Sequence, residues 1–234
     1  MEYHLSPPLV IYADIECYID NKIHKPALIG AYHVWHNALQ TKFENKYFLF
    51  EGDNCIINFL HHLENVAQNL YDNQCETTRQ PNTLTADEKV KHENADSCNK
   101  CKSEFTDEVV KVRDHDHITG RYRQTLCRKC NLRLRLNRRE LPIFFHNFKN
   151  YDSHIICYKA IGRMKSWKLD VVAATAEKYI TLSASVPVNE YRGKTVYFKL
   201  KFSDSYQFLN ALLSELAKGL QSYEHVETLR TEFP

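Results

Sequence analysis

Two cysteine pairs near the middle of the chain constrain its fold more than any other feature. They read Cys98-x-x-Cys101 and Cys127-x-x-Cys130, and 25 residues separate the pairs. Each such turn can present two thiolates to one metal ion, so the spacing predicts a structural, tetrahedral zinc site with four cysteine ligands. A segment this short cannot bury a core of its own, and a zinc ion worth about 10–16 kcal/mol would replace one. The alternative is four unrelated reduced thiols.

The rest of the composition favours an intracellular protein. No apolar run approaches the ~20 residues that span a bilayer, and the first residues lack the basic segment of a signal peptide. Cys17, Cys55, Cys75 and Cys157 are scattered, so we interpret them as buried thiols and not as a disulfide framework. We expect no membrane partner, and a nuclear, viral or mobile-element replication setting is compatible with these features.

Positive charge is concentrated in one stretch. Between Lys111 and Arg139 ten basic residues face only Asp114 and Asp116, a local net charge of about +8, whereas the whole chain carries +2. A basic island of this kind is typical of a site for a polyanion such as a nucleic acid. A solvated helix face is the alternative.

Hydrophobic patterns on both sides of the cysteine-rich segment predict an α/β protein. The polar segment 72–82, which contains Pro81, predicts a loop, and Thr85-Ala-Asp-Glu88 has the form of a capping box. We therefore expect a mixed sheet covered by helices, called the frame (1–85 and 140–234), and an inserted zinc module, called the insert (86–139). Strands are predicted at 9–15, 27–35, 46–50, 141–145, 171–172, 179–186 and 196–202, and helices at 56–70, 151–161 and 209–220.

A run of acidic and imidazole side chains lies between the cysteine pairs. It reads Val112-Arg-Asp-His-Asp-His-Ile-Thr-Gly120, and its last two residues predict a turn. Side chains alternate across a strand, which puts Asp114 and Asp116 on one face and His115 and His117 on the other. A purely structural hairpin is the alternative to a catalytic one.

This segment closely resembles the endonuclease VII group of His-Me finger (ββα-metal) nucleases. The shared features, over about 40 residues, are CxxC, DHDH, TG, a return strand with YR, and CxxCN. The resemblance implies that Asp114 and Asn131 hold one Mg²⁺ or Mn²⁺ and that His115 activates the attacking water. It leaves His117 and Asp116 to orient these groups.

The chemistry of these residue types agrees with that assignment. A hard cation with oxygen ligands stabilises the charge that develops on a phosphodiester, and a neutral imidazole with a pKa near ~6.5 can accept the proton of water. The chain departs from the family at Arg123-Gln124, because glycine often follows this arginine and the longer side chain would crowd a phosphate. We predict DNA contacts by Arg113, Arg121, Arg123, Arg128 and Lys129.

The frame carries a second set of motifs. Asp14-Ile-Glu16 places two carboxylates on the same side of a strand. Together with the run from His146 to Asp152, it resembles the first two motifs of the proofreading 3′–5′ exonuclease domain of protein-primed family B DNA polymerases. The run from Ser203 to Leu209 resembles the segment of that group that contacts single-stranded primer.

That second resemblance implies a ribonuclease H-like fold with two Mg²⁺ ions held by Asp14, Glu16 and Asp152. It also implies contacts to the terminal nucleotides by Asn147, Tyr151 and Ser205. For Asn147, a bridge between loop backbone groups is the alternative.

The third motif of that exonuclease group, YxxxD, does not follow Asp152. Tyr223-Glu-His-Val-Glu227 has the spacing with glutamate in place of aspartate, so Asp204 and Glu227 are the candidates for the missing carboxylate. The later polymerase motifs do not follow either, and we expect no polymerase activity.

The sequence therefore favours a Mg²⁺-dependent deoxyribonuclease whose insert cuts DNA endonucleolytically, possible substrates including branched or structured DNA. A 3′–5′ exonuclease centred on the frame is the first alternative. A catalytically inactive zinc-containing module that binds DNA in a salt-dependent way is the second. A homodimer follows only from family analogy, and no heptad pattern indicates one.

Overall fold

A seven-stranded mixed sheet forms the frame in the computed structural model, which describes residues 7–36, 43–79, 81–117, 119–134, 139–159, 161–175 and 178–218. The three central strands run parallel to one another, and all other neighbours are antiparallel. This confirms the predicted mixed α/β architecture. In spatial order the strands are β3 (Lys46–Glu51), β2 (Ile23–Trp35), β1 (Leu9–Asp20), β6 (Glu140–Phe145), β9 (Lys194–Asp204), β8 (Lys178–Tyr191) and β7 (Lys168–Thr175).

Strand β1 shows why the frame can carry a polar site on one face. Ile11, Ala13 and Ile15 are buried, and the alternate residues Asp14 and Glu16 lie on the exposed face. The two carboxylates therefore share a face of the sheet, as their i, i+2 spacing predicts.

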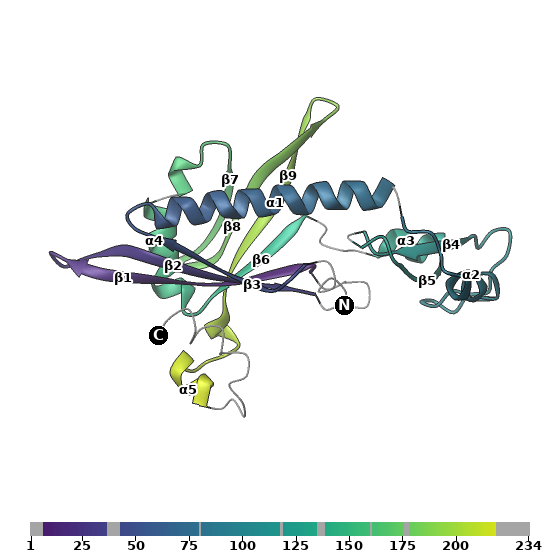
Figure 1. The fold of residues 1–234 in the computed structure, drawn as a ribbon, viewed down its shortest axis with the longest axis horizontal. Coiled ribbons are helices and arrows are strands. Elements are labelled where there is room, and N and C mark those ends of the chain that lie inside the picture. Colours follow the sequence, from purple (N-terminus) through teal and green to yellow (C-terminus); the bar gives the residue numbers. More distant parts are fainter. Residues whose placement is uncertain are drawn as a thin grey trace.

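Helix α1 (Cys55–Arg79) covers the opposite face, where it buries Phe59, Leu60 and Leu63 completely (Figure 1). With 25 residues at 1.5 Å each, it is about 37 Å long. The loop predicted for 72–82 is wrong as far as Arg79, because the helix continues. Tyr71 and Gln74 are buried there, and the Asn189 side chain of β8 donates to the Tyr71 hydroxyl at 2.9 Å. Polar residues on the outer side of a long helix produced the error.

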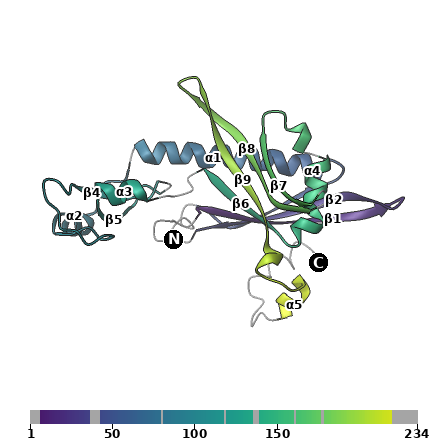
Figure 2. The same ribbon diagram turned by 180° about the vertical axis from the view of Figure 1, so that it is seen from behind.

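The insert lies beyond the carboxyl-terminal end of α1, to one side of the large sheet (Figures 1 and 2). It has its own small core of Cys98, Leu126, Cys127, Cys130 and Leu134, separate from the core of the frame. The predicted capping box of Thr85 and Glu88 is present at the start of its first helix. Its elements are α2 (Ala86–Glu93), β4 (Lys111–His115), β5 (Tyr122–Cys127) and α3 (Arg128–Arg133).

The last elements are shorter than predicted. Helix α4 (Asp152–Lys159) follows β6, but α5 (Leu213–Lys218) covers only part of the helix predicted for 209–220. Phe208, Leu209 and Leu212 are exposed, so within the described residues the apolar face of that pattern has no surface to pack against. The Tyr223–Glu227 motif lies outside the described residues. No helix in the described part of the chain is long and apolar enough to cross a membrane.

Candidate metal centre and nuclease hairpin

The four cysteines of the insert converge on one point. Their Sγ atoms all lie within 4.8 Å of one another. Backbone N–H groups point at the sulfurs, from Cys127 to Cys98 at 3.2 Å and from Cys130 to Cys127 at 3.4 Å. These groups stabilise thiolates, and a tetrahedral zinc ion fits such a donor set. Within the described ranges, no other group of three or more metal-ligating side chains is as tight.

Ionisation of these thiols is already favoured at one ligand. The Ser103 side chain, whose oxygen is 3.3 Å from the sulfur, lowers the pKa of Cys101 to about 6. The other cysteines differ from these four: Cys55 is buried and Cys17 and Cys75 are half-buried free thiols. The side chain of Cys157 lies outside the described residues.

The segment between the cysteine pairs forms the predicted hairpin. Strand β4 pairs with β5 from Lys111 opposite Cys127 to His115 opposite Tyr122, with a bulge next to Asp114. The bulge leaves Arg123 as the extra residue of β5. Helix α3 begins directly after β5, with Cys127 as its N-cap, and packs against both strands.

Asp114 is buried beneath an arginine. The Arg123 guanidinium donates to both carboxylate oxygens, at 2.9 Å from Nε and 2.7 Å from Nη2, and the Gln124 amide lies at 3.4 Å. The Asp114 side chain is 3% exposed. Arg123 also approaches Asp116 at 3.8 Å. The arginine predicted to contact DNA therefore neutralises the carboxylate predicted to bind a metal.

The two histidines lie on the other face. The rings of His115 and His117 are 4.6 Å apart, between centroids. Asp116 closes the turn, because its carboxylate accepts from the backbone N–H of Thr119 at 2.8 Å and from the Thr119 hydroxyl at 3.1 Å. The hairpin thus separates the acidic and imidazole groups as the alternation predicts.

Part of the basic island is used inside the insert. The Lys111 ammonium donates to three backbone carbonyls at the end of α2, those of His92, Glu93 and Ala95, and caps that helix. Exposed cations remain on the hairpin and on α3: Arg113, Arg121, Arg128 and Lys129. Asn131 lies half-buried on α3.

The parallel strands of the frame bring a second acidic cluster together. Asp152 is 2% exposed at the start of α4, and its Oδ1 has no hydrogen-bond partner. Burial, followed by the charges of Asp14, Asp204 and Glu16, raises the pKa of Asp152 to about 8. Burial and Glu16 also raise the pKa of Asp14.

Asp204 occupies a place that the motif search could name but not locate. It ends β9, next to Phe145 of β6, and is 4% exposed. Its carboxylate accepts the backbone N–H groups of Lys149 and Tyr206, each at 3.0 Å. It therefore fixes the loop that leads to Asp152.

The residues predicted to contact a DNA terminus are largely engaged with this loop. The Ser205 hydroxyl donates to the Phe145 carbonyl at 3.2 Å and lies 3.0 Å from His146 Nδ1. Asn147 has a left-handed backbone with φ 63°, which asparagine tolerates better than most residues. The Tyr151 hydroxyl is 2.7 Å from His24 Nδ1, a contact that no motif indicated.

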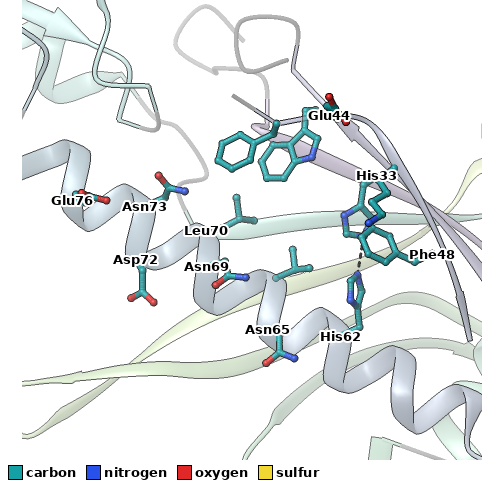
Figure 3. A pocket seen from close by; sticks show the side chains of 14 residues that line it. His33, Glu44, Phe48, His62, Asn65, Asn69, Leu70, Asp72, Asn73 and Glu76 are labelled. Carbon is teal, nitrogen blue, oxygen red and sulfur yellow. Dashed lines mark hydrogen bonds between the residues drawn. The ribbon is translucent and has the colours of Figure 1, made fainter. Parts of the chain in front are cut away.

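A hollow of about 860 Å³ between α1, β2 and β3 also escaped the sequence. There the Nε2 atoms of His33 and His62 are 3.1 Å apart (Figure 3). Burial and the neighbouring His62 lower the pKa of His33 to about 4.

The fold and geometry define a class of site: a β-hairpin and a following short helix, held together by four cysteines in a mixed α/β protein. Residues 71–152 match the family model of recombination endonuclease VII. The match includes all four cysteines and the hairpin, and it extends into α1 and to the end of the loop at Asp152. No curated protein and no solved structure matched the chain, and the resemblance to a polymerase exonuclease has no support from these comparisons.

Proposed function

We propose that this protein is a metal-dependent DNA nuclease whose insert cuts phosphodiester bonds within a strand. The observation that carries the proposal is the Asp-His-Asp-His hairpin held by four converging cysteines, inside a segment that matches recombination endonuclease VII. We propose the predicted boundaries of 86–139 for the insert.

The donor types at the hairpin fit a hard divalent cation. Asp114 contributes a buried carboxylate, and Asn131 contributes an amide oxygen from α3, which packs against both strands. Mg²⁺ or Mn²⁺ bound by these two residues would stabilise the charge on the phosphate and the leaving oxygen. Arg123 holds the Asp114 carboxylate ionised and in place.

His115 is the proposed general base. Its imidazole takes a proton from water, the water oxygen bonds to phosphorus, and the bond to the 3′ oxygen breaks. His117, with its ring 4.6 Å away, fixes the orientation of that imidazole. Asp116 shapes the turn through Thr119, so its role is to position the histidines. Arg113, Arg121, Arg128 and Lys129 attract the DNA backbone.

A cleavage assay with two variants tests the proposal. Junction, flap and single-stranded DNA are incubated with Mg²⁺ and wild-type protein, Asp114→Ala or His115→Ala. We expect His115→Ala to lose about 10²–10⁴-fold in rate. The exposed Asp107→Ala and His61→Ala serve as matched controls and should cut normally. Unchanged cleavage in both test variants would remove the insert as catalyst, and salt-dependent binding without product would favour the inactive binding module.

A second candidate function rests on the acidic cluster of the frame. The mutual effect of Asp14 and Asp152, with Glu16 nearby, favours a site that a divalent cation completes. We propose, as the weaker candidate, 3′–5′ exonuclease activity in a ribonuclease H-like frame formed by residues 1–85 and 140–234. Stepwise trimming of a 3′-labelled single strand should disappear in Asp14→Ala, and trimming that persists would refute this candidate.

A further inference from the structure

A pocket beside the hairpin has a form that the proposed cleavage reaction does not explain. It measures about 510 Å³ and lies between β4, β5 and the extended segment that joins α1 to α2. That volume falls within the range of about 300–1,000 Å³ that holds small ligands. The hairpin pocket is lined by Pro81, Asn82, Thr83, Leu84, Val112, Arg113, His115, Gly120 and Tyr122.

The wall formed by the joining segment is fixed to the hairpin turn. The Asn82 backbone N–H donates to the Gly120 carbonyl at 3.0 Å, and its side-chain amide donates to the Thr119 carbonyl at 3.1 Å. Gly120 has φ +70°, and a Cβ there would lie 2.9 Å from Asn82 Oδ1. The glycine is therefore required both by the turn and by the close approach of Asn82.

The pocket also contains a fixed aromatic ring. The Tyr122 hydroxyl is 2.7 Å from Thr125 Oγ1, and its ring meets the edge of His92 at 6.3 Å between centroids. Thr125 is in turn 2.9 Å from His92 Nδ1. These contacts hold the tyrosine in place, and a pre-fixed ring is a good stacking surface for a nucleobase.

Charge and reactivity meet the ring in the same pocket. Arg113 is exposed and cationic, and His115 is the proposed general base. An aromatic surface, a cation and a base together match the parts of one nucleotide and its phosphate. A base inside a duplex has neighbours stacked on both faces, so only an unpaired nucleotide can enter.

We propose that the hairpin pocket binds one unpaired nucleotide of a DNA substrate, stacked on Tyr122, next to the phosphate that is cut. This inference rests on the proposed function, since it assigns a substrate class to the same site. The protein would then select bulged or branched DNA over a fully paired duplex by its base contact, and the basic residues would bind both equally.

Binding without cleavage tests this assignment. Fluorescence anisotropy without added Mg²⁺ compares a paired duplex with the same duplex carrying one unpaired nucleotide. Base–aromatic stacking predicts a preference of roughly 5- to 150-fold for the second DNA. Tyr122→Ala should lose this preference, as should Thr83→Trp, which fills the pocket without touching the fold of the hairpin. Tyr122→Phe, which keeps the ring, and Tyr191→Ala, an exposed tyrosine on β8, should retain it.

Each outcome decides the assignment. Equal affinity of the wild-type protein for the two DNAs overturns it, as does a preference that survives in Thr83→Trp with zinc content unchanged. A preference without any Mg²⁺-dependent product would support the pocket and refute the proposed cleavage. Cleavage that ignores unpaired nucleotides would do the reverse.

Discussion

The insert and the frame each bury an aspartate, and they compensate its charge in opposite ways. Asp114 of the insert is held by both arms of the Arg123 guanidinium. Asp152 of the frame faces other carboxylates, and its pKa rises to about 8. The insert therefore carries its own counter-ion, whereas the frame favours either a proton or an added cation at the same kind of group.

This difference separates stability from metal binding. A cation that approaches Asp114 competes with an arginine already in place. A cation that approaches Asp152 replaces a proton and meets a carboxylate oxygen without a hydrogen-bond partner. We therefore expect stabilisation by Mg²⁺ to be stronger at the frame, even if the insert is the faster catalyst.

The largest expected effect comes from removing a zinc ligand. Cys127→Ser should abolish zinc binding and unfold the insert, because a structural zinc contributes about 10–16 kcal/mol where little apolar core exists. The frame has its own core and should stay folded. Metal analysis and limited proteolysis check this, with Cys75→Ser as the control. A folded, zinc-loaded Cys127→Ser protein would contradict the four-cysteine centre.

Arg123→Gln tests the counter-ion of the insert. The substitution leaves the buried Asp114 carboxylate without its partner, which costs about 3–5 kcal/mol in comparable buried pairs. Mg²⁺ should restore part of that loss, since it can replace the guanidinium charge. Thermal unfolding with and without Mg²⁺ measures both effects, and the exposed Arg121→Gln on the same hairpin is the control. A variant as stable as Arg121→Gln would show that the pair contributes little.

Asp152→Asn tests the opposite arrangement. Because the pKa of Asp152 is raised to about 8, only the unfolded chain loses this proton between about pH 4 and pH 8, and stability falls as pH rises. The amide removes that dependence, so the variant should be more stable at pH 7.5, by on the order of 2–3 kcal/mol. Mg²⁺ should raise the melting temperature of the wild-type protein more than that of Asp152→Asn. Equal Mg²⁺ effects would exclude a cation at this carboxylate.

Local spacing accounts for much of what the sequence could predict. Cys98 and Cys101 stand in one turn, and alternation alone separates Asp114 from His115, so the hairpin and its metal centre follow from residues close in the chain. Most strands of the frame follow from apolar runs for the same reason. The extent of α1 does not, because its last turns are held by a contact between Tyr71 and β8.

The parts that escaped prediction depend on distant contacts. Strand order alone brings Asp204 to the loop before Asp152, and no pattern in either segment specifies that order. The pairing of Arg123 with Asp114 depends on a bulge, which leaves no mark in the alternation of the strand. The site types were thus predictable from the residues, and their electrostatic environments were not.

The smallest expected effect concerns His33, a buried group of the frame with no counter-ion. Its pKa is about 4, so between pH 6.5 and about 4 only the unfolded chain takes up a proton. Stability should therefore fall as pH drops through this window, by about 1–2 kcal/mol after allowance for solvent. This slope is opposite in sign to that of Asp152. Melting temperatures of His33→Phe should decline less on acidification than those of the wild type, with the exposed His61→Phe as control. Identical slopes would mean that the histidine pair remains neutral in both states or titrates with its surroundings, which the contact at 3.1 Å with His62 argues against.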